Sequence, residues 1–126
     1  MTGLNVFRPT VLLYGLPADR ADGKIIRDYL KSKLIRAVNV YPGNDECTLG
    51  ELLQAEGLYP AKKKQGPEKP VLVMFAMQNK EMDALLTFLR ENAPIELKAV
   101  VTPHNMNWKF SRLVRELKRE RSMMTR

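Results

Sequence analysis

One cysteine and one histidine occur among the 126 residues, Cys47 and His104, and each follows a predicted strand. A cysteine beside a histidine can act as a nucleophile, so this pair is the first chemistry to consider. We expect the two strands at opposite edges of a four-stranded sheet, about 14 Å apart, whereas a working pair lies within hydrogen-bond reach. In a mixed sheet we do not expect the two turns to share one end of the sheet. One Cys and one His also cannot supply the three or four ligands that zinc takes, so we predict no catalytic residue, no metal site and no cofactor.

The segment Gly15–Asp19 follows the first predicted strand, where a phosphate-binding loop would lie. It contains neither G-x-G-x-x-G nor G-x-x-x-x-G-K-[ST], so it lacks the repeated glycines that let backbone amides converge on a phosphate. We interpret this segment as an ordinary turn.

A dense group of polar side chains, together with the single tryptophan, lies at residues 102–108, where a predicted strand ends and a helix begins. Helix N-termini attract anions, and loop residues held by a rigid scaffold often bind ligands. The candidate binding residues are Thr102, His104, Asn105 and Trp108. We favour a structural role, in which Asn105 or Asn107 caps the helix and Trp108 packs on the sheet.

Lysine and arginine number 21 against 14 acidic residues, which gives a net charge of +7 and admits an anionic partner such as nucleic acid. The candidate anion-binding residues are Lys62, Lys63, Lys64, Lys109 and Arg112. Lys69, Arg115, Lys118, Arg119 and Arg121 complete the two basic clusters. Glu116 and Glu120 lie at helical spacings from Arg112 and Arg119, so we favour a solvated helix face. The sequence also lacks an aromatic pair on an exposed strand of the kind that stacks RNA bases.

Two stretches of the chain resemble each other, Thr10–Asn44 and Pro70–Asn105. Leu12 corresponds to Leu72 at an offset of 60, and after one inserted residue Asn44 corresponds to Asn105 at an offset of 61. Each copy reads as strand, helix, strand and a Pro-x-Asn turn into a further helix. We predict that the two units superpose.

Continuous apolar runs predict two central strands with both faces buried, Val11–Tyr14 and Val71–Phe75. Polar interruptions place two further strands nearer the edges, Ala37–Tyr41 and Leu97–Thr102. The predicted helices are Gly23–Leu34 capped by Asp22, Lys80–Glu91 capped by Asn79, a short helix from Thr48 to about Glu56 that Gly57 ends, and a longer helix after Asn105. Thr48 and Glu51 match the capping box.

These elements predict a single α/β domain over residues 1–126, built from two βαβα units at about 10–57 and 70–121. Residues 58–69 are expected to form a loop, and residues 122–126 to fray. We expect a four-stranded sheet with helices on both faces, which right-handed crossovers would make all-parallel. The alternative is a ferredoxin-like mixed sheet with added helices.

The composition is that of an ordinary soluble protein, with 44% hydrophobic and 28% charged residues. The longest apolar run, Val71–Met77, is far below the roughly 18 to 20 residues that cross a bilayer, so no membrane association is expected. The first ten residues do not match a secretory signal, and a single cysteine fits a reducing compartment. We therefore expect a cytoplasmic location.

The last third of the chain resembles a family of small bacterial proteins catalogued only as a domain of unknown function. The shared pattern is a strand with a lysine, T-P-x-N, a tryptophan and L-x-x-E-L. In this chain its residues are Lys98, Thr102, Pro103, Asn105, Trp108, Leu113, Glu116 and Leu117, and the apolar strand Val71–Phe75 accompanies them. The resemblance implies a bacterial cytoplasmic origin and supplies no activity, cofactor or catalytic residue.

We accordingly expect a non-enzymatic binding or protein-interaction module whose partner is another protein or a second copy of the chain. The alternative is a module that binds nucleic acid or a phosphate ligand through its basic clusters, and phosphate contacts would make that binding fall steeply with salt.

Overall fold

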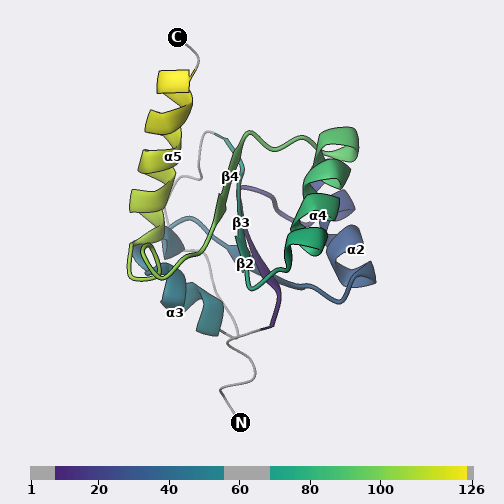
Figure 1. Cartoon of the computed structure of the whole chain (residues 1–126), viewed down its shortest axis with the longest axis horizontal. Helices are drawn as coiled ribbons and strands as arrows, with labels where there is room; N and C mark the ends of the chain where they lie inside the picture. Colours follow the sequence, from purple (N-terminus) through teal and green to yellow (C-terminus); the bar gives the residue numbers. More distant parts are fainter. Residues whose placement is uncertain (1–7, 56–68, 125–126) are drawn as a thin grey trace.

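The computed structural model describes residues 8–55 and 69–124, which form a four-stranded sheet between two layers of helices (Figure 1). The elements in chain order are β1 Thr10–Tyr14, α2 Ala21–Ser32, β2 Arg36–Val40, the 3₁₀ helix η1 Asn44–Glu46, α3 Leu49–Gln54, β3 Val71–Phe75, α4 Asn79–Asn92, β4 Leu97–Val100 and α5 Phe110–Met124. Within these ranges no helix is both long enough and apolar enough to cross a bilayer. The predicted Lys62–Lys64 cluster and the stop at Gly57 lie outside the described residues.

The strand order is β2-β1-β3-β4. β1 and β2 are parallel, β3 and β4 are parallel, and β1 pairs antiparallel with β3. The α/β class, the central positions of β1 and β3 and the helices on both faces are therefore confirmed. The all-parallel order is wrong, because the chain after α3 enters the sheet in the opposite direction. The mixed alternative is correct, although the two strands of each unit are adjacent and not split as in a ferredoxin-like sheet.

The continuous apolar runs of β1 and β3 are buried on both faces, as predicted. Leu12 and Tyr14 point into the core under α3 and α5, whereas Val11 and Leu13 point into the core under α2 and α4. Figure 1 shows α2 and α4 on one side of the sheet and α3 and α5 on the other. Each central strand therefore contributes to two cores, which is why neither strand alternates between apolar and polar residues.

The two βαβα units share their strand register. Val11 pairs with Ala37, and Val71 pairs with Leu97, the same separation along the chain. The correspondence of Leu12 with Leu72 does not hold, because Leu12 lies in the α3–α5 core and Leu72 in the α2–α4 core. A one-residue slip reverses the face of every side chain in a strand, so an offset of 61 relates β1 to β3. That the units superpose throughout stays a prediction.

Two of the predicted caps are wrong. The carbonyl of Arg20 accepts the amide of Lys24 at 2.9 Å, so α2 begins earlier than predicted and Asp22 lies in its first turn. The carbonyl of Gln78 likewise accepts the amide of Met82 at 2.9 Å, so Asn79 is already helical. The cap position lies two residues before Asp22 in α2 and one residue before Asn79 in α4, so each polar residue is already helical.

The capping box at the start of α3 is confirmed. The amide of Glu51 donates to the Thr48 hydroxyl at 3.1 Å, and the Glu51 carboxylate accepts the amide of Thr48 at 2.8 Å. This box fixes where the short helix begins, and therefore fixes the segment just before it, which contacts the candidate site.

Candidate functional site

The T-P-H-N turn after β4 is closed by the side chain of Asn105, which is only 9% exposed. Its Oδ1 accepts the amide of Thr102 at 2.8 Å, and its Nδ2 donates to the carbonyl of Val100 at 3.1 Å. The predicted cap is wrong, because α5 begins later, at Phe110, and neither Asn105 nor Asn107 directly precedes it. Asn105 instead donates to the Val100 carbonyl at the end of the edge strand β4. An unpaired carbonyl on an edge strand can pair with another strand, and this hydrogen bond satisfies it.

The Pro-x-Asn turn after β2 is built in the same way. The amide of Tyr41 donates to Oδ1 of Asn44 at 2.9 Å, and the amide of Asn44 donates to the carbonyl of Tyr41 at 2.9 Å. Asn105 makes the matching backbone bond to Thr102 at 3.2 Å. The shared geometry explains why both turns carry Asn at the same position, and it makes this residue structural in both.

The segments that follow the two turns meet each other. The amide of Leu49 donates to the carbonyl of Trp108 at 3.0 Å, and the amide of Phe110 donates to the carbonyl of Cys47 at 2.9 Å. Thr48 and Lys109 lie opposite each other between these bonds. The two turns lie at opposite ends of the sheet, as expected for a mixed order, because β2 and β4 run in opposite directions. The segments that follow the turns nevertheless meet on the same face of the sheet.

This convergence does not join the cysteine and histidine in a shared site. Cys47 packs against the α3–α5 core, whereas His104 is exposed and lies edge-on to Trp108. Over residues 8–55 and 69–124, no three His, Cys, Asp or Glu side chains gather in a way that could hold a metal ion.

The exposed surface at this junction carries a cluster of three side chains, His104, Trp108 and Arg112, which we call the tryptophan patch. The Arg112 guanidinium carbon lies 4.0 Å from the centroid of the indole ring. The His104 ring lies 5.5 Å from that centroid, at an interplanar angle of 66°. Trp108 is half-buried and packs against the α3–α5 core, so one side of the indole is structural while the other meets His104 and Arg112.

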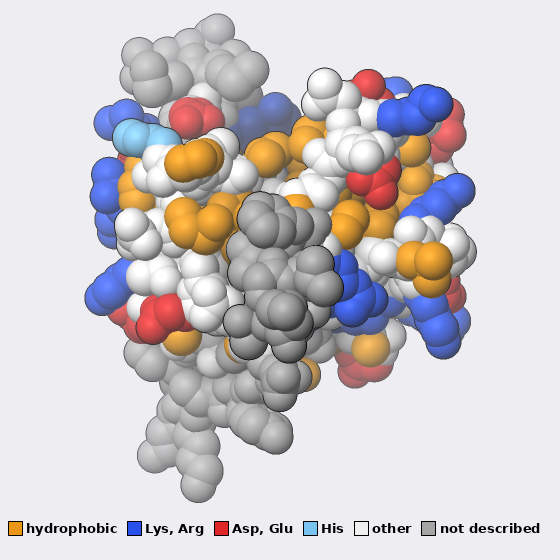
Figure 2. Space-filling model, turned by 60° about the horizontal axis from the view of Figure 1, so that its bottom comes forward, with side chains coloured by type: hydrophobic (Ala, Val, Ile, Leu, Met, Phe, Trp, Pro, Cys, Tyr) orange, Lys and Arg blue, Asp and Glu red, His pale blue; other side chains and the backbone are white. Residues whose placement is uncertain are grey.

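Basic residues accompany the patch on α5 and just before it. Lys109 makes an ion pair of 3.4 Å with Glu46, and both side chains are mostly exposed. Among the described carboxylates, none pairs with Arg112 or Arg115, and Glu116 pairs instead with Arg119 at 3.8 Å. Figure 2 shows the histidine, in pale blue, at one corner of this face of the molecule, with both basic and acidic side chains next to it.

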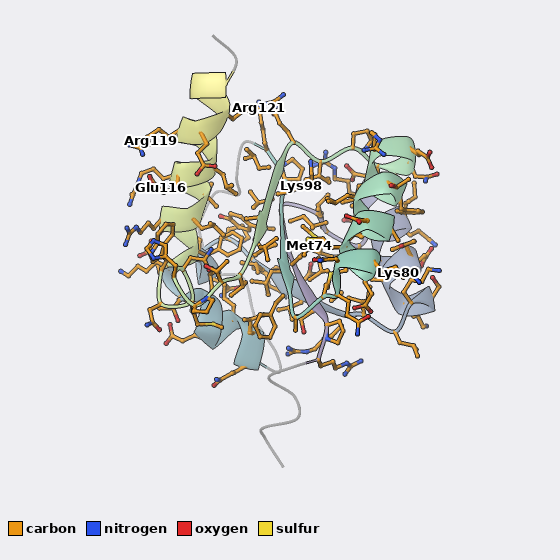
Figure 3. The ribbon with its side chains drawn as sticks, in the orientation of Figure 1. Met74, Lys80, Lys98, Glu116, Arg119 and Arg121 are labelled. Atoms are coloured by element: carbon orange, nitrogen blue, oxygen red, sulfur yellow. The ribbon has the colours of Figure 1, made fainter. Side chains whose placement is uncertain are left out.

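Other basic residues form ion pairs and hydrogen bonds within the chain. Glu96 accepts Lys69 at 2.5 Å and Arg121 at 3.0 Å, so it ties the C-terminal part of α5 to the start of β4. The hydrogen bond from Lys69, followed by that from Arg121, holds the pKa of Glu96 below its ordinary value. Burial, and then the neighbouring Arg121, lowers the pKa of Lys98, whose ammonium donates to the Ile95 carbonyl. Figure 3 shows Arg121 on the side of α5 toward β4 and Arg119 on the outer side.

The comparisons with known proteins bear on this part of the chain. Residues 70–124 match the family model described as "Domain of unknown function (DUF3783)". This part of the chain is therefore similar to that family. The match confirms the resemblance found in the sequence, and the DUF3783 region spans β3, α4, β4 and α5, which is one βαβα unit. It contains the whole tryptophan patch, whereas Cys47 and Glu46 lie in the other unit.

Neither a curated protein nor a solved structure matches the chain. His104, Trp108 and Arg112 were named from the sequence for separate reasons, and their contacts with one another were not predicted. The three residues are four positions apart, which is the spacing of neighbours on one face of a helix, and this spacing was the available signal. It was a weak signal because His104 and Trp108 precede α5, which begins at Phe110.

Proposed function

We propose that the protein is a non-enzymatic protein-interaction module and that the tryptophan patch is its docking surface. The observation that carries this proposal is the Arg112 guanidinium stacked on a half-buried Trp108. Tryptophan and arginine are the residue types most enriched among the few side chains that dominate binding energy at protein interfaces.

The patch is held in place before any partner arrives. The amide of Trp108 donates to the carbonyl of Asn105 at 3.0 Å, and its own carbonyl accepts the amide of Leu49. Its ring also packs against the core. A side chain that is already ordered loses little conformational entropy on binding, so such an anchor contributes more to affinity than a flexible one.

Nucleic-acid binding is the alternative, and the stacking argues against it at this site. A nucleobase binds a tryptophan by lying on the face of its ring. Here the guanidinium of Arg112 lies over that ring, and the indole also packs on the core. The lysine cluster that would strengthen the alternative, Lys62–Lys64, lies outside the described residues.

Affinity purification from the organism that makes the protein tests the proposal when three forms are compared. These are the natural protein, Arg112→Ala and the control Arg90→Ala, which removes an equal charge from the exposed side of α4. We expect a protein partner that Arg90→Ala retains and Arg112→Ala loses. Equal recovery with Arg112→Ala, or nuclease-sensitive recovery of RNA or DNA in place of a protein, would overturn the proposal.

A further inference from the structure

We infer that the partner presents an acidic segment, and that Glu46 occupies part of its binding surface in the unbound protein. This inference rests on the proposed function and adds the chemistry of the ligand. Carboxylates of the segment engage Arg112 and Arg115, and they replace the Glu46 carboxylate at Lys109.

Arg112 is prepared to bind a carboxylate. Its guanidinium carbon lies 4.0 Å from the centroid of the Trp108 ring, and this contact holds the guanidinium over the indole. A guanidinium fork matches a carboxylate with two parallel hydrogen bonds, and stacking on an aromatic ring leaves its N–H edge accessible. No carboxylate within the described ranges pairs with this residue.

Lys109 already holds a carboxylate, although weakly. The Glu46 pair is 3.4 Å long, and the two side chains are 61% and 62% exposed. An exposed ion pair of this kind adds little stability, so a second carboxylate can displace it at small cost. Glu46 comes from η1 of the other βαβα unit, so the first unit supplies the internal competitor for a surface on the second.

The charge balance around the patch favours an acidic ligand over a neutral one. Lys109, Arg112 and Arg115 are basic, and Glu46 is the acidic residue paired among them, because Glu116 is paired with Arg119. Charge complementarity of this type raises association rates and excludes partners of the wrong sign. Glu96, by contrast, already neutralises the second basic group, formed by Lys69 and Arg121, so that region offers less charge to an acidic ligand.

Intrinsic fluorescence of the full chain tests this inference, because Trp108 is its single tryptophan. The probe is a short peptide of alternating Glu and Leu, compared with the same peptide carrying Gln in place of Glu and with a short single-stranded RNA. We expect a saturable fluorescence change with the Glu peptide that weakens as salt is raised. Equal binding of the Gln peptide, tighter binding of the RNA, or no fluorescence change with the Glu peptide would overturn the inference.

Matched variants locate the effect. Arg112→Gln should weaken the Glu peptide about tenfold or more, because a charge-assisted hydrogen bond is lost. Arg112→Lys should recover only part of that loss, because lysine keeps the charge but not the fork. Glu46→Gln should strengthen binding about twofold to fivefold by removing the competitor. Arg90→Gln should leave it unchanged, and melting curves confirm that each variant is folded.

The two proposals fail separately. If purification yields a protein partner that depends on Arg112 while Glu46→Gln leaves peptide affinity unchanged or lowers it, the docking surface stands and the acidic-segment inference falls. If Arg112→Ala retains every partner and the Glu peptide does not bind, both fall.

Discussion

Replacing Trp108 with alanine should destabilise the protein, because half of the indole is part of the core. A fully buried aromatic side chain costs about 3 to 5 kcal/mol when truncated to alanine. Trp108 is only half-buried, so we expect about 2 to 3 kcal/mol from lost packing. Loss of the Arg112 stack adds about 0.5 to 1 kcal/mol. The free energy of unfolding should therefore fall by roughly 3 kcal/mol.

Urea unfolding followed by circular dichroism measures this change, since the variant lacks the fluorescent reporter. The midpoint of thermal unfolding should fall by roughly 10 °C for a domain of this size. Trp108→Phe keeps an aromatic ring at the site and should recover most of the loss. Arg112→Ala removes the stack but not the core contact, and should cost about 1 kcal/mol or less. A Trp108→Ala variant that melts at the natural temperature would refute the packing described here.

Asn105→Ala should lower the free energy of unfolding by about 1 to 3 kcal/mol, because it leaves the amide of Thr102 and the carbonyl of Val100 without a partner, whereas exposed Asn107→Ala should change it by less than about 0.5 kcal/mol. Cys47→Ser should leave peptide binding at the tryptophan patch intact, and loss of binding in a folded variant would contradict the placement of Cys47 in the core and outside the binding surface. The Glu96 ion pairs stabilise the fold above the ordinary carboxyl pKa of 4.5, and that contribution is lost as pH falls through the lowered pKa of the folded state. The free energy of unfolding, measured across this pH range, should be larger for the natural protein than for Glu96→Gln at neutral pH, and the difference should vanish in acid. A difference that persists in acid would refute this role of the Glu96 ion pairs.

Local patterns predicted the elements well, because each depends on a few neighbouring residues. The unbroken apolar runs of Val11–Tyr14 and Val71–Phe75 required burial on both faces, and the structure provides two cores. Thr48 and Glu51 satisfy each other within one turn, so their capping box could be read directly. The prediction that Asp22 caps α2 was wrong because the cap position is Arg20, two residues earlier, and the Arg20 side chain makes no capping hydrogen bond that the sequence could have indicated.

The arrangement of the units could not be read from the sequence in the same way. Parallel and antiparallel pairing of β1 with β3 bury the same side chains, and the choice depends on how the chain returns to the sheet after α3. The meeting of Cys47 with Phe110 and of Leu49 with Trp108 joins residues far apart in sequence through backbone groups, which carry no sequence signature. The half-burial of Trp108 follows from that contact.

The central claim is that a partner protein docks on the tryptophan patch, and site-specific photo-cross-linking tests it most directly. A photoreactive amino acid replaces exposed His104, and a control protein carries it in place of Arg90 on the other side of the sheet. We predict a discrete protein adduct from position 104 in cells that make the protein, absent from position 90 and lost when Arg112→Ala is added. The same adducts from both positions, no protein adduct from position 104, or an adduct that Arg112→Ala leaves intact would contradict the claim.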